Sequence, residues 1–232
     1  MRKYLAELIG TAALVIVGCG TAMLVGCDAA AGSGYLLTAL AFGLTVMALA
    51  YSIGNISGCH VNPAVSLAFF IKGDLSRREF GFYVVAQIFG GWIGVGILGA
   101  IWGLGGLTDM TGAYGANSLS GLGGNAIAGF LVETVLTFLF VLVILGVTDS
   151  RQSHGNVAGL IIGLTLALVH ILGIGLTGTS VNPARSLAPA IAAAIAGNAE
   201  PMQSLWVFIL APLAGAALAA YTYKFLTEND GQ

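Results

Sequence analysis

The tripeptide Asn-Pro-Ala occurs twice in this chain, at Asn62-Pro63-Ala64 and at Asn182-Pro183-Ala184. Asparagine is a favoured N-cap residue, and proline at the first helical position loses no hydrogen bond, because its missing N–H would be unpaired there anyway. Each copy therefore predicts a helix start. The apolar runs that follow, Val65 to Ile71 and Arg185 to Ala194, are about half as long as a bilayer-spanning helix of ~20 residues. The sequence thus predicts two half-helices that begin inside a membrane.

The amino-acid composition leaves few residues to face water. Hydrophobic residues make up 57% and charged residues 8% of the 232 positions, whereas a soluble domain carries about 25% charged residues. We therefore predict an all-α membrane protein, with room for about six spans of ~20 residues besides the two half-helices. The formal net charge of −2 predicts no nucleic-acid partner. The cysteines form neither a disulfide framework nor a metal-binding spacing, so we expect no metal and no cofactor.

Apolar stretches between polar breaks predict the positions of six membrane spans. A signal peptide is the alternative for the first, because Arg2 and Lys3 precede it. However, its apolar run is longer than a signal core of about 7–15 residues and contains Glu7. One half-helix lies between the second and third spans, and the other between the fifth and sixth. The predicted spans are Tyr4 to Val25, Leu36 to Ile53, Phe80 to Trp102, Ile127 to Val147, Val157 to Ile174 and Leu205 to Phe225.

The chain consists of two similar halves, which together form a single domain of residues 1–232. The halves, approximately residues 1–110 and 125–232, each hold three spans and one half-helix. They open on similar segments, Ala6 to Thr11 in the first and Val132 to Thr137 in the second. Because three is an odd number, the second half enters the membrane from the opposite side, and the repeat is inverted.

Basic residues predict the orientation of the chain in the membrane. Seven of the eight lie on one side of this topology, namely Arg2, Lys3, Lys72, Arg77, Arg78, Arg151 and Lys224. Since positively charged loops stay in the cytoplasm, we expect both termini there. The opposite side carries Asp28, Asp109 and Glu200, and we assign no chemistry to its long loop of residues 103–125.

Two facing helix starts favour a pore that passes water and refuses protons. A helix N-terminus carries about half a positive charge, so two such ends turn the oxygen of an intervening water inward and oppose hydronium. If the side-chain oxygens of Asn62 and Asn182 cap their own half-helices, their N–H groups are left to donate to that water. The alternative is that both residues only cap helices.

Arg185 is the next indication of function. A cation in the first turn of a helix opposes the helix dipole, and at membrane depth it costs about 2.5–3.5 kcal/mol on insertion scales. We therefore interpret Arg185 as a functional residue. The alternative is a structural arginine whose side chain extends to the membrane surface.

These features resemble the aquaporin family. The resemblance rests on two Asn-Pro-Ala boxes in the two halves of an apolar chain, with Ser57-Gly58-Cys59-His60-Val61 before the first and Arg185-Ser186 after the second. It covers nearly the whole chain and is strongest with the water-selective prokaryotic branch, the aquaporin Z type. It implies an inverted repeat of six transmembrane helices and two re-entrant half-helices. It also implies a passive, single-file water channel that excludes protons and ions, a homotetramer, and a location in the inner (plasma) membrane.

The resemblance further implies roles for single residues. The matching glutamates, Glu7 and Glu133, accept hydrogen bonds from backbone N–H groups of the half-helix loops and so shape the pore wall. His60 and Cys59 line the cytoplasmic vestibule. In mercury-sensitive relatives a cysteine often takes the place of Thr179, so we expect thiol reagents to act here through Cys59. The four residues that match the selectivity filter are Phe42, His170, Thr179 and Arg185.

Other functions stay open at this point. A channel for a small neutral solute such as glycerol or ammonia is one, although glycerol-conducting relatives generally replace the histidine with glycine and follow the arginine with aspartate, where this chain has Ser186. An ion-coupled secondary transporter is another, since inverted repeats with broken helices are also transporter architecture, and it would give Glu7 and Glu133 a role in proton transfer. An enzyme is not expected, because no Gly-x-Ser-x-Gly or His-Glu-x-x-His motif occurs.

Overall fold

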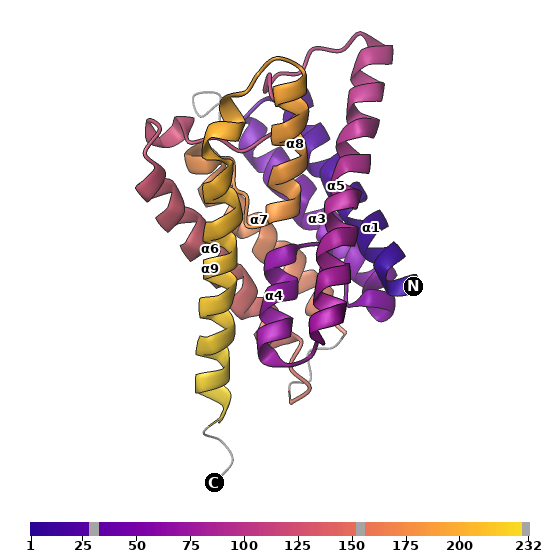
Figure 1. Ribbon diagram of the computed structural model, residues 1–232, viewed down its shortest axis with the longest axis vertical. Coiled ribbons are helices and arrows are strands. Elements are labelled where there is room, and N and C mark those ends of the chain that lie inside the picture. Colours follow the sequence, from indigo (N-terminus) through magenta and orange to yellow (C-terminus); the bar gives the residue numbers. More distant parts are fainter. Residues whose placement is uncertain (28–32, 152–155, 229–232) are drawn as a thin grey trace.

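The computed structural model describes residues 1–27, 33–151 and 156–228, and every regular element among them is a helix (Figure 1). Asp28 lies outside the described residues. The helices are α1 (Arg2–Leu14), the π-helix η1 (Val15–Cys19), α2 (Gly20–Val25), α3 (Ser33–Ser57), α4 (Pro63–Lys72), α5 (Arg77–Gly105), the 3-10 helix η2 (Ser120–Leu122), α6 (Ala126–Val147), α7 (Ala158–Thr177), α8 (Pro183–Ile195) and α9 (Glu200–Glu228).

Six helical stretches in the described part of the chain are long and apolar enough to cross a membrane. The first is formed by α1, η1 and α2 together, and the others are α3, α5, α6, α7 and α9. The prediction of six spans is confirmed, but several helices extend beyond the predicted ends. Helix α5 begins at Arg77 rather than at Phe80, because Ser76 and Glu79 form a capping box ahead of the apolar run. Hydropathy finds the apolar part of a helix and misses such polar first turns.

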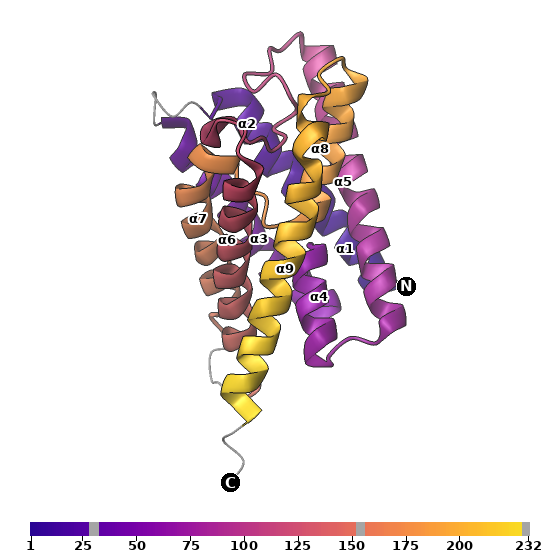
Figure 2. The ribbon, with the colours of Figure 1, turned by 60° about the vertical axis from the view of Figure 1, so that its left-hand side comes forward.

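The two half-helices, α4 and α8, begin near the centre of the molecule and run in opposite directions (Figures 1 and 2). Each packs against the last long helix of the other half, α4 against α9 and α8 against α5. The chain turns back after α4 at Gly73, whose left-handed φ of 101° ends the helix. The N-terminal ends of α4 and α8 are thus held near the centre of the molecule by helices from both halves of the chain.

The packing of the long helices repeats in the two halves. Helix α1 packs on α5 and α6 on α9, while α3 packs on α7 across the halves. A side chain on Gly90 would collide with the carbonyl of Leu8, and one on Gly215 with the carbonyl of Thr134. Small residues let backbones approach closely where lipid provides no hydrophobic driving force between helices.

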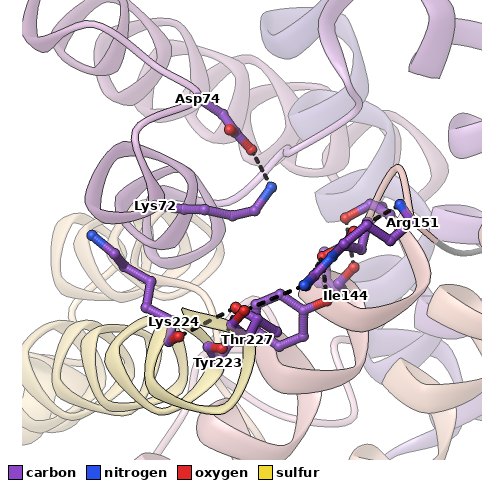
Figure 3. Close-up of polar contacts among 9 residues, drawn as sticks. Lys72, Asp74, Ile144, Arg151, Tyr223, Lys224 and Thr227 are labelled. Carbon is purple, nitrogen blue, oxygen red and sulfur yellow. Dashed lines mark hydrogen bonds and ion pairs between the residues drawn. The ribbon is translucent and has the colours of Figure 1, made fainter. Parts of the chain in front are cut away.

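At the end of the molecule where α4, α6 and α9 finish, polar side chains form a cluster (Figure 3). Asp149, which is 8% exposed, accepts a hydrogen bond of 2.5 Å from the Tyr223 hydroxyl and is paired with the guanidinium of Arg151 at 2.8 Å. Lys72 pairs with Asp74 at 2.6 Å. The contacts of Asp149 fasten the segment after α6 to the last turns of α9.

Candidate functional site

The two loops that lead into the half-helices share an unusual backbone conformation. In the first, Cys59 and Val61 have φ values of 51° and 45°. In the second, Thr179 and Val181 have φ values of 46° and 44°. A left-handed conformation is a rare outlier for β-branched residues and costs about 1–3 kcal/mol at each position. Strain of this kind persists only where surrounding contacts hold it.

Two fully buried glutamates provide those contacts. Glu7 accepts hydrogen bonds from the backbone N–H groups of His60 at 2.9 Å and Val61 at 2.6 Å. Glu133 does the same for Ser180 and Val181, both at 2.9 Å. Hydrogen bonds to charged groups contribute about 1.5–3 kcal/mol each, which is enough to offset the strain in each loop.

Side chains complete each carboxylate's set of donors. Ser57 and Gln87 each donate to Glu7 at 2.7 Å, and Thr177 donates to Glu133 at 2.6 Å. A trans peptide points its N–H and its C=O in opposite directions. Because the N–H groups point at the glutamates, the carbonyls of the same peptides point away from them. Those carbonyls belong to Cys59 and His60 in one loop and to Thr179 and Ser180 in the other.

The two asparagines connect the halves at the centre. The side-chain oxygen of Asn62 accepts from the N–H of Ala64 at 2.8 Å, and that of Asn182 accepts from Ala184 at 3.1 Å. The amide nitrogen of each donates to the opposite loop, Asn62 to the Val181 carbonyl at 2.7 Å and Asn182 to the Val61 carbonyl at 2.9 Å. Each carboxamide therefore caps its own helix, ties down the other loop, and keeps one N–H.

A narrow cavity runs past these residues. Its volume is ≈ 40 Å³, and it is lined by both asparagines, by the two loops and by side chains of α3, α6 and α7. Since a water molecule needs about 10–15 Å³ by this measure, only a few waters fit. At one end it meets a wide mouth of ≈ 710 Å³, and Arg185 lines both spaces. Arg185 thus lies where the narrow cavity meets the wide mouth.

Phe42, His170 and Arg185 meet at this narrow region. The Phe42 ring stacks on His170 with ring centroids 4.5 Å apart, and the guanidinium carbon of Arg185 lies 5.0 Å from the centre of the same ring. Among the described residues six buried side-chain polar atoms have no hydrogen-bond partner, and three of them belong to residues discussed here, namely His170 Nε2, Thr179 Oγ1 and Arg185 Nε. Thr179 lies in the loop before Asn182, and its hydroxyl lies against Gly173 of α7.

The hydrogen bond of His170 fixes its role. Its Nδ1 lies 2.9 Å from the carbonyl oxygen of Leu166, and because a carbonyl only accepts, Nδ1 carries the proton in the neutral ring. Nε2 is then an acceptor. Beside Phe42 the structure therefore gives a donor from Arg185 and an acceptor from His170.

Comparison with known proteins assigns the family. The sequence profile of the major intrinsic protein family matches residues 1–223. The chain belongs to the major intrinsic protein family. Aquaporin Z of Bradyrhizobium diazoefficiens is 39% identical over 240 residues, covering 99% of this chain and 95% of that protein. Aquaporin Z of Rhodopseudomonas palustris is 40% identical over 233 residues, covering 98% of this chain and 94% of that protein.

A solved structure supports the fold of this major intrinsic protein. The X-ray structure of the aquaglyceroporin from Plasmodium falciparum superposes with a TM-score of 0.85 at 23% sequence identity, covering 98% of this chain and 97% of that chain. The predicted fold class, an all-α inverted repeat with two re-entrant half-helices, is confirmed.

One part of this family member carries a contact that the sequence did not indicate. We assigned no chemistry to the loop of residues 103–125, but among the described residues it supplies two hydrogen-bond acceptors of the Arg185 guanidinium. Nη1 donates to the carbonyl of Gly115 at 3.0 Å and to Oδ1 of Asn117 at 2.8 Å. Neither residue belongs to a motif, and only their position in space reveals them.

Gly18 is a second residue that sequence reasoning missed. It lies in η1, where the chain makes a π-helical turn between α1 and α2. A side chain at Gly18 would collide with the Phe42 ring, so this glycine leaves the space that the ring occupies. Single π-helical turns inside α-helices often occur at functional sites.

The remaining candidates lie along the same cavity. Cys59 and His60 both line it. The His60 ring stacks on Phe69 with centroids 4.5 Å apart, and its Nδ1 lies 3.1 Å from Ser66 Oγ. Within the described residues, no three His, Cys, Asp or Glu side chains lie together as metal ligands would.

Proposed function

We propose that this protein is a passive, water-selective membrane channel that conducts single-file water down osmotic gradients and excludes protons and ions. The observation that carries the proposal is the cavity of ≈ 40 Å³ that passes between two opposed half-helix N-termini. A passage of so small a volume holds its few water molecules in a row. The aquaporin Z relatives, at about 40% identity over nearly their full length, support the same function.

Proton exclusion follows from the centre of that row. The two helix ends each contribute about half a positive charge, and Asn62 and Asn182 each keep one N–H for a water oxygen. A water held there turns its hydrogens outward in both directions, so protons cannot pass along a continuously oriented chain. Four carbonyls point away from the glutamates and offer acceptors that replace hydrogen bonds lost by the moving waters. They belong to Cys59, His60, Thr179 and Ser180.

Solute selection belongs to the residues around Arg185. We assign the filter to Phe42, His170, Thr179 and Arg185, in which a ring on one side and polar atoms on the other leave room for water. The imidazole of His170 keeps the passage narrow, which disfavours glycerol, the main alternative permeant. Arg185 places a positive charge at the entrance and repels cations.

Glu7 and Glu133 have a structural role in this proposal, since each holds a strained loop. A role in proton transfer is not needed.

The remaining parts of the proposal concern the whole protein. We place it in the inner (plasma) membrane as a homotetramer with both termini in the cytoplasm. Its single domain consists of inverted repeats of approximately residues 1–110 and 125–232. It is a channel and not an enzyme, and water and the lipid bilayer are its partners.

Stopped-flow light scattering on proteoliposomes tests this function. Vesicles that contain the protein are challenged with an impermeant osmolyte and, separately, with glycerol. We expect rapid shrinkage with a low activation barrier, a rate linear in the osmotic gradient, and no re-swelling in glycerol. Shrinkage no faster than in protein-free vesicles would contradict a water channel, a rate that saturates would favour a transporter, and re-swelling would favour the neutral-solute channel.

A further inference from the structure

The position of Arg185 is not explained by its own helix. Arginine has a long side chain with many rotamers, and this one lies beside a cavity of only ≈ 40 Å³. In the described part of the chain no carboxylate forms an ion pair with it. Its guanidinium is held by two neutral oxygens of the outer loop, the carbonyl of Gly115 and the side chain of Asn117.

Asn117 is itself held in place from several directions. It is 2% exposed, and its Nδ2 donates to the carbonyl of Thr177 at 3.2 Å. Its Oδ1 accepts a second hydrogen bond, from the hydroxyl of Ser186 at 2.7 Å. Gly178, with a φ of 73°, lets the loop approach, since a side chain there would lie 3.2 Å from Asn117 Nδ2. The acceptor that faces Arg185 therefore has a fixed direction.

The outer loop around Asn117 is also well anchored. Asp109 accepts hydrogen bonds from the N–H of Thr111 at 2.9 Å and of Tyr114 at 2.7 Å. The Thr111 hydroxyl accepts from the N–H of Gly115 at 2.9 Å. On the other side of Asn117, Leu119 is buried in a small apolar cluster with residues of α9. The loop is thus held in place on both sides of Asn117, beside the entrance of the cavity.

We propose that Asn117 is the positioning residue for Arg185. Its amide oxygen holds the guanidinium against the wall beside Phe42, and because the amide is neutral, the positive charge of Arg185 still acts on cations. A hydrocarbon side chain would release the guanidinium into the passage. A carboxylate would hold it as well but would neutralise its charge. This inference rests on the proposed function.

Two substitutions separate position from charge. In Asn117→Ala the guanidinium keeps only the Gly115 carbonyl and enters the cavity, so we expect water permeability per channel to fall roughly threefold or more. In Asn117→Asp an acceptor remains, so water permeability should stay within about twofold of the wild type, while sodium leak rises roughly tenfold, because the entrance charge is cancelled. Asn198→Ala is the matched control, since Asn198 binds the same loop at Gly112 without touching Arg185.

A double-mutant cycle tests whether Asn117 acts through Arg185. In an Arg185→Val background, Asn117→Ala should change water permeability by less than about 1.5-fold, because residues that act through one contact are not additive. An equal loss in both backgrounds would mean that Asn117 only folds the loop and would overturn the proposal. So would an Asn117→Asp channel as tight to sodium as the wild type. Wild-type vesicles in the same series report the proposed function separately, since they shrink rapidly whether or not Asn117 positions Arg185.

Discussion

The proposed filter depends on a glycine that is not part of it. Phe42 is 1% exposed and is enclosed by His170, by Arg185 and by the backbone of Gly18. A methyl group on Gly18 would lie within 2.5 Å of Cδ1 and Cζ of that ring, closer than any stable contact. The ring also lines the cavity. The size of residue 18 thus sets how far Phe42 enters the passage.

Gly18→Ala should therefore narrow the channel. Overpacking of this kind costs about 1–3 kcal/mol, and a ring displaced into the cavity should lower water permeability roughly tenfold while glycerol stays excluded. The measurement is stopped-flow shrinkage at equal protein content. Gly96→Ala is the control, because nothing lies within 4 Å of the position of its side chain. Equal permeability of Gly18→Ala and the wild type would show that Phe42 has another way to move.

The three cysteines differ in their access to the passage. Cys59 lines the narrow cavity, Cys27 lines the wide outer mouth, and Cys19 is fully buried. A mercury adduct on Cys59 would occupy much of a ≈ 40 Å³ space, whereas one on Cys27 would leave most of the ≈ 710 Å³ mouth open. We expect mercury to block water flux in the wild type and in Cys27→Ser but not in Cys59→Ser. Block that persists in Cys59→Ser would place the reactive thiol elsewhere.

Among the helices, local signals predicted what depends on local sequence. The half-helices follow from Asn-Pro pairs and short apolar runs, and the six spans follow from hydropathy. The π-helical turn at Val15–Cys19 was not predictable, because it matches no periodicity and its consequence is a contact with Phe42. The contact of Arg185 with Asn117 joins residues 68 positions apart and leaves no pattern in the sequence. The assignment of Phe42, His170, Thr179 and Arg185 to a filter came only through the family resemblance and stays a proposal.

The connection after α6 is fastened by a single carboxylate. Asp149 accepts from the backbone N–H of Arg151 at 2.8 Å, besides its pairs with the Arg151 guanidinium and the Tyr223 hydroxyl (Figure 3). The Arg151 guanidinium and the Tyr223 hydroxyl hold the pKa of Asp149 well below its usual range. The neighbouring Thr148 lines the inner cavity. The cluster therefore connects the end of the cavity near Thr148 to α9. This end is opposite the proposed filter.

Asp149→Asn should weaken the protein without altering its selectivity. We expect the thermal midpoint in detergent at pH 7 to fall by about 2–4 °C, with water and glycerol permeability unchanged, because the filter is remote. A group with a lowered pKa stabilises the fold above its ordinary pKa, and this stabilisation is lost as the pH falls towards the lowered value. The difference between wild type and variant should therefore shrink below about pH 4.

Asp74→Asn is the matched control for this cluster, since Asp74 is exposed and, among the described residues, forms an ion pair only with Lys72. It should change the midpoint by less than Asp149→Asn at pH 7. A difference between Asp149→Asn and the wild type that is constant from pH 7 to pH 3 would contradict the pH argument. A change in glycerol exclusion would contradict the separation of the inner cluster from the filter.

At the scale of the molecule, the two halves share a backbone plan and differ in side chains. Both loops have left-handed residues at equivalent positions, an equivalent glutamate that accepts from their N–H groups, and an asparagine that caps the half-helix. The first repeat places Cys59 where the second places Thr179, and only the second carries an arginine after its Asn-Pro-Ala. The shared features form a symmetric centre that suits water orientation. Under the proposed function, the differences make one end of the passage a charged filter and give the channel two separate barriers.

Arg185→Val tests that separation. The half-helix ends remain and the passage widens, so we expect water permeability to equal or exceed that of the wild type. The entrance loses its positive charge, so protons or small cations should enter, which a pH-sensitive dye and a sodium-sensitive dye inside the vesicles will report. Arg151→Val is the control, because Arg151 lies at the inner end with half of its side chain exposed. If vesicles with Arg185→Val stayed tight to both ions, the central helix ends alone would be the barrier, and Arg185 would serve only to set the width of the passage.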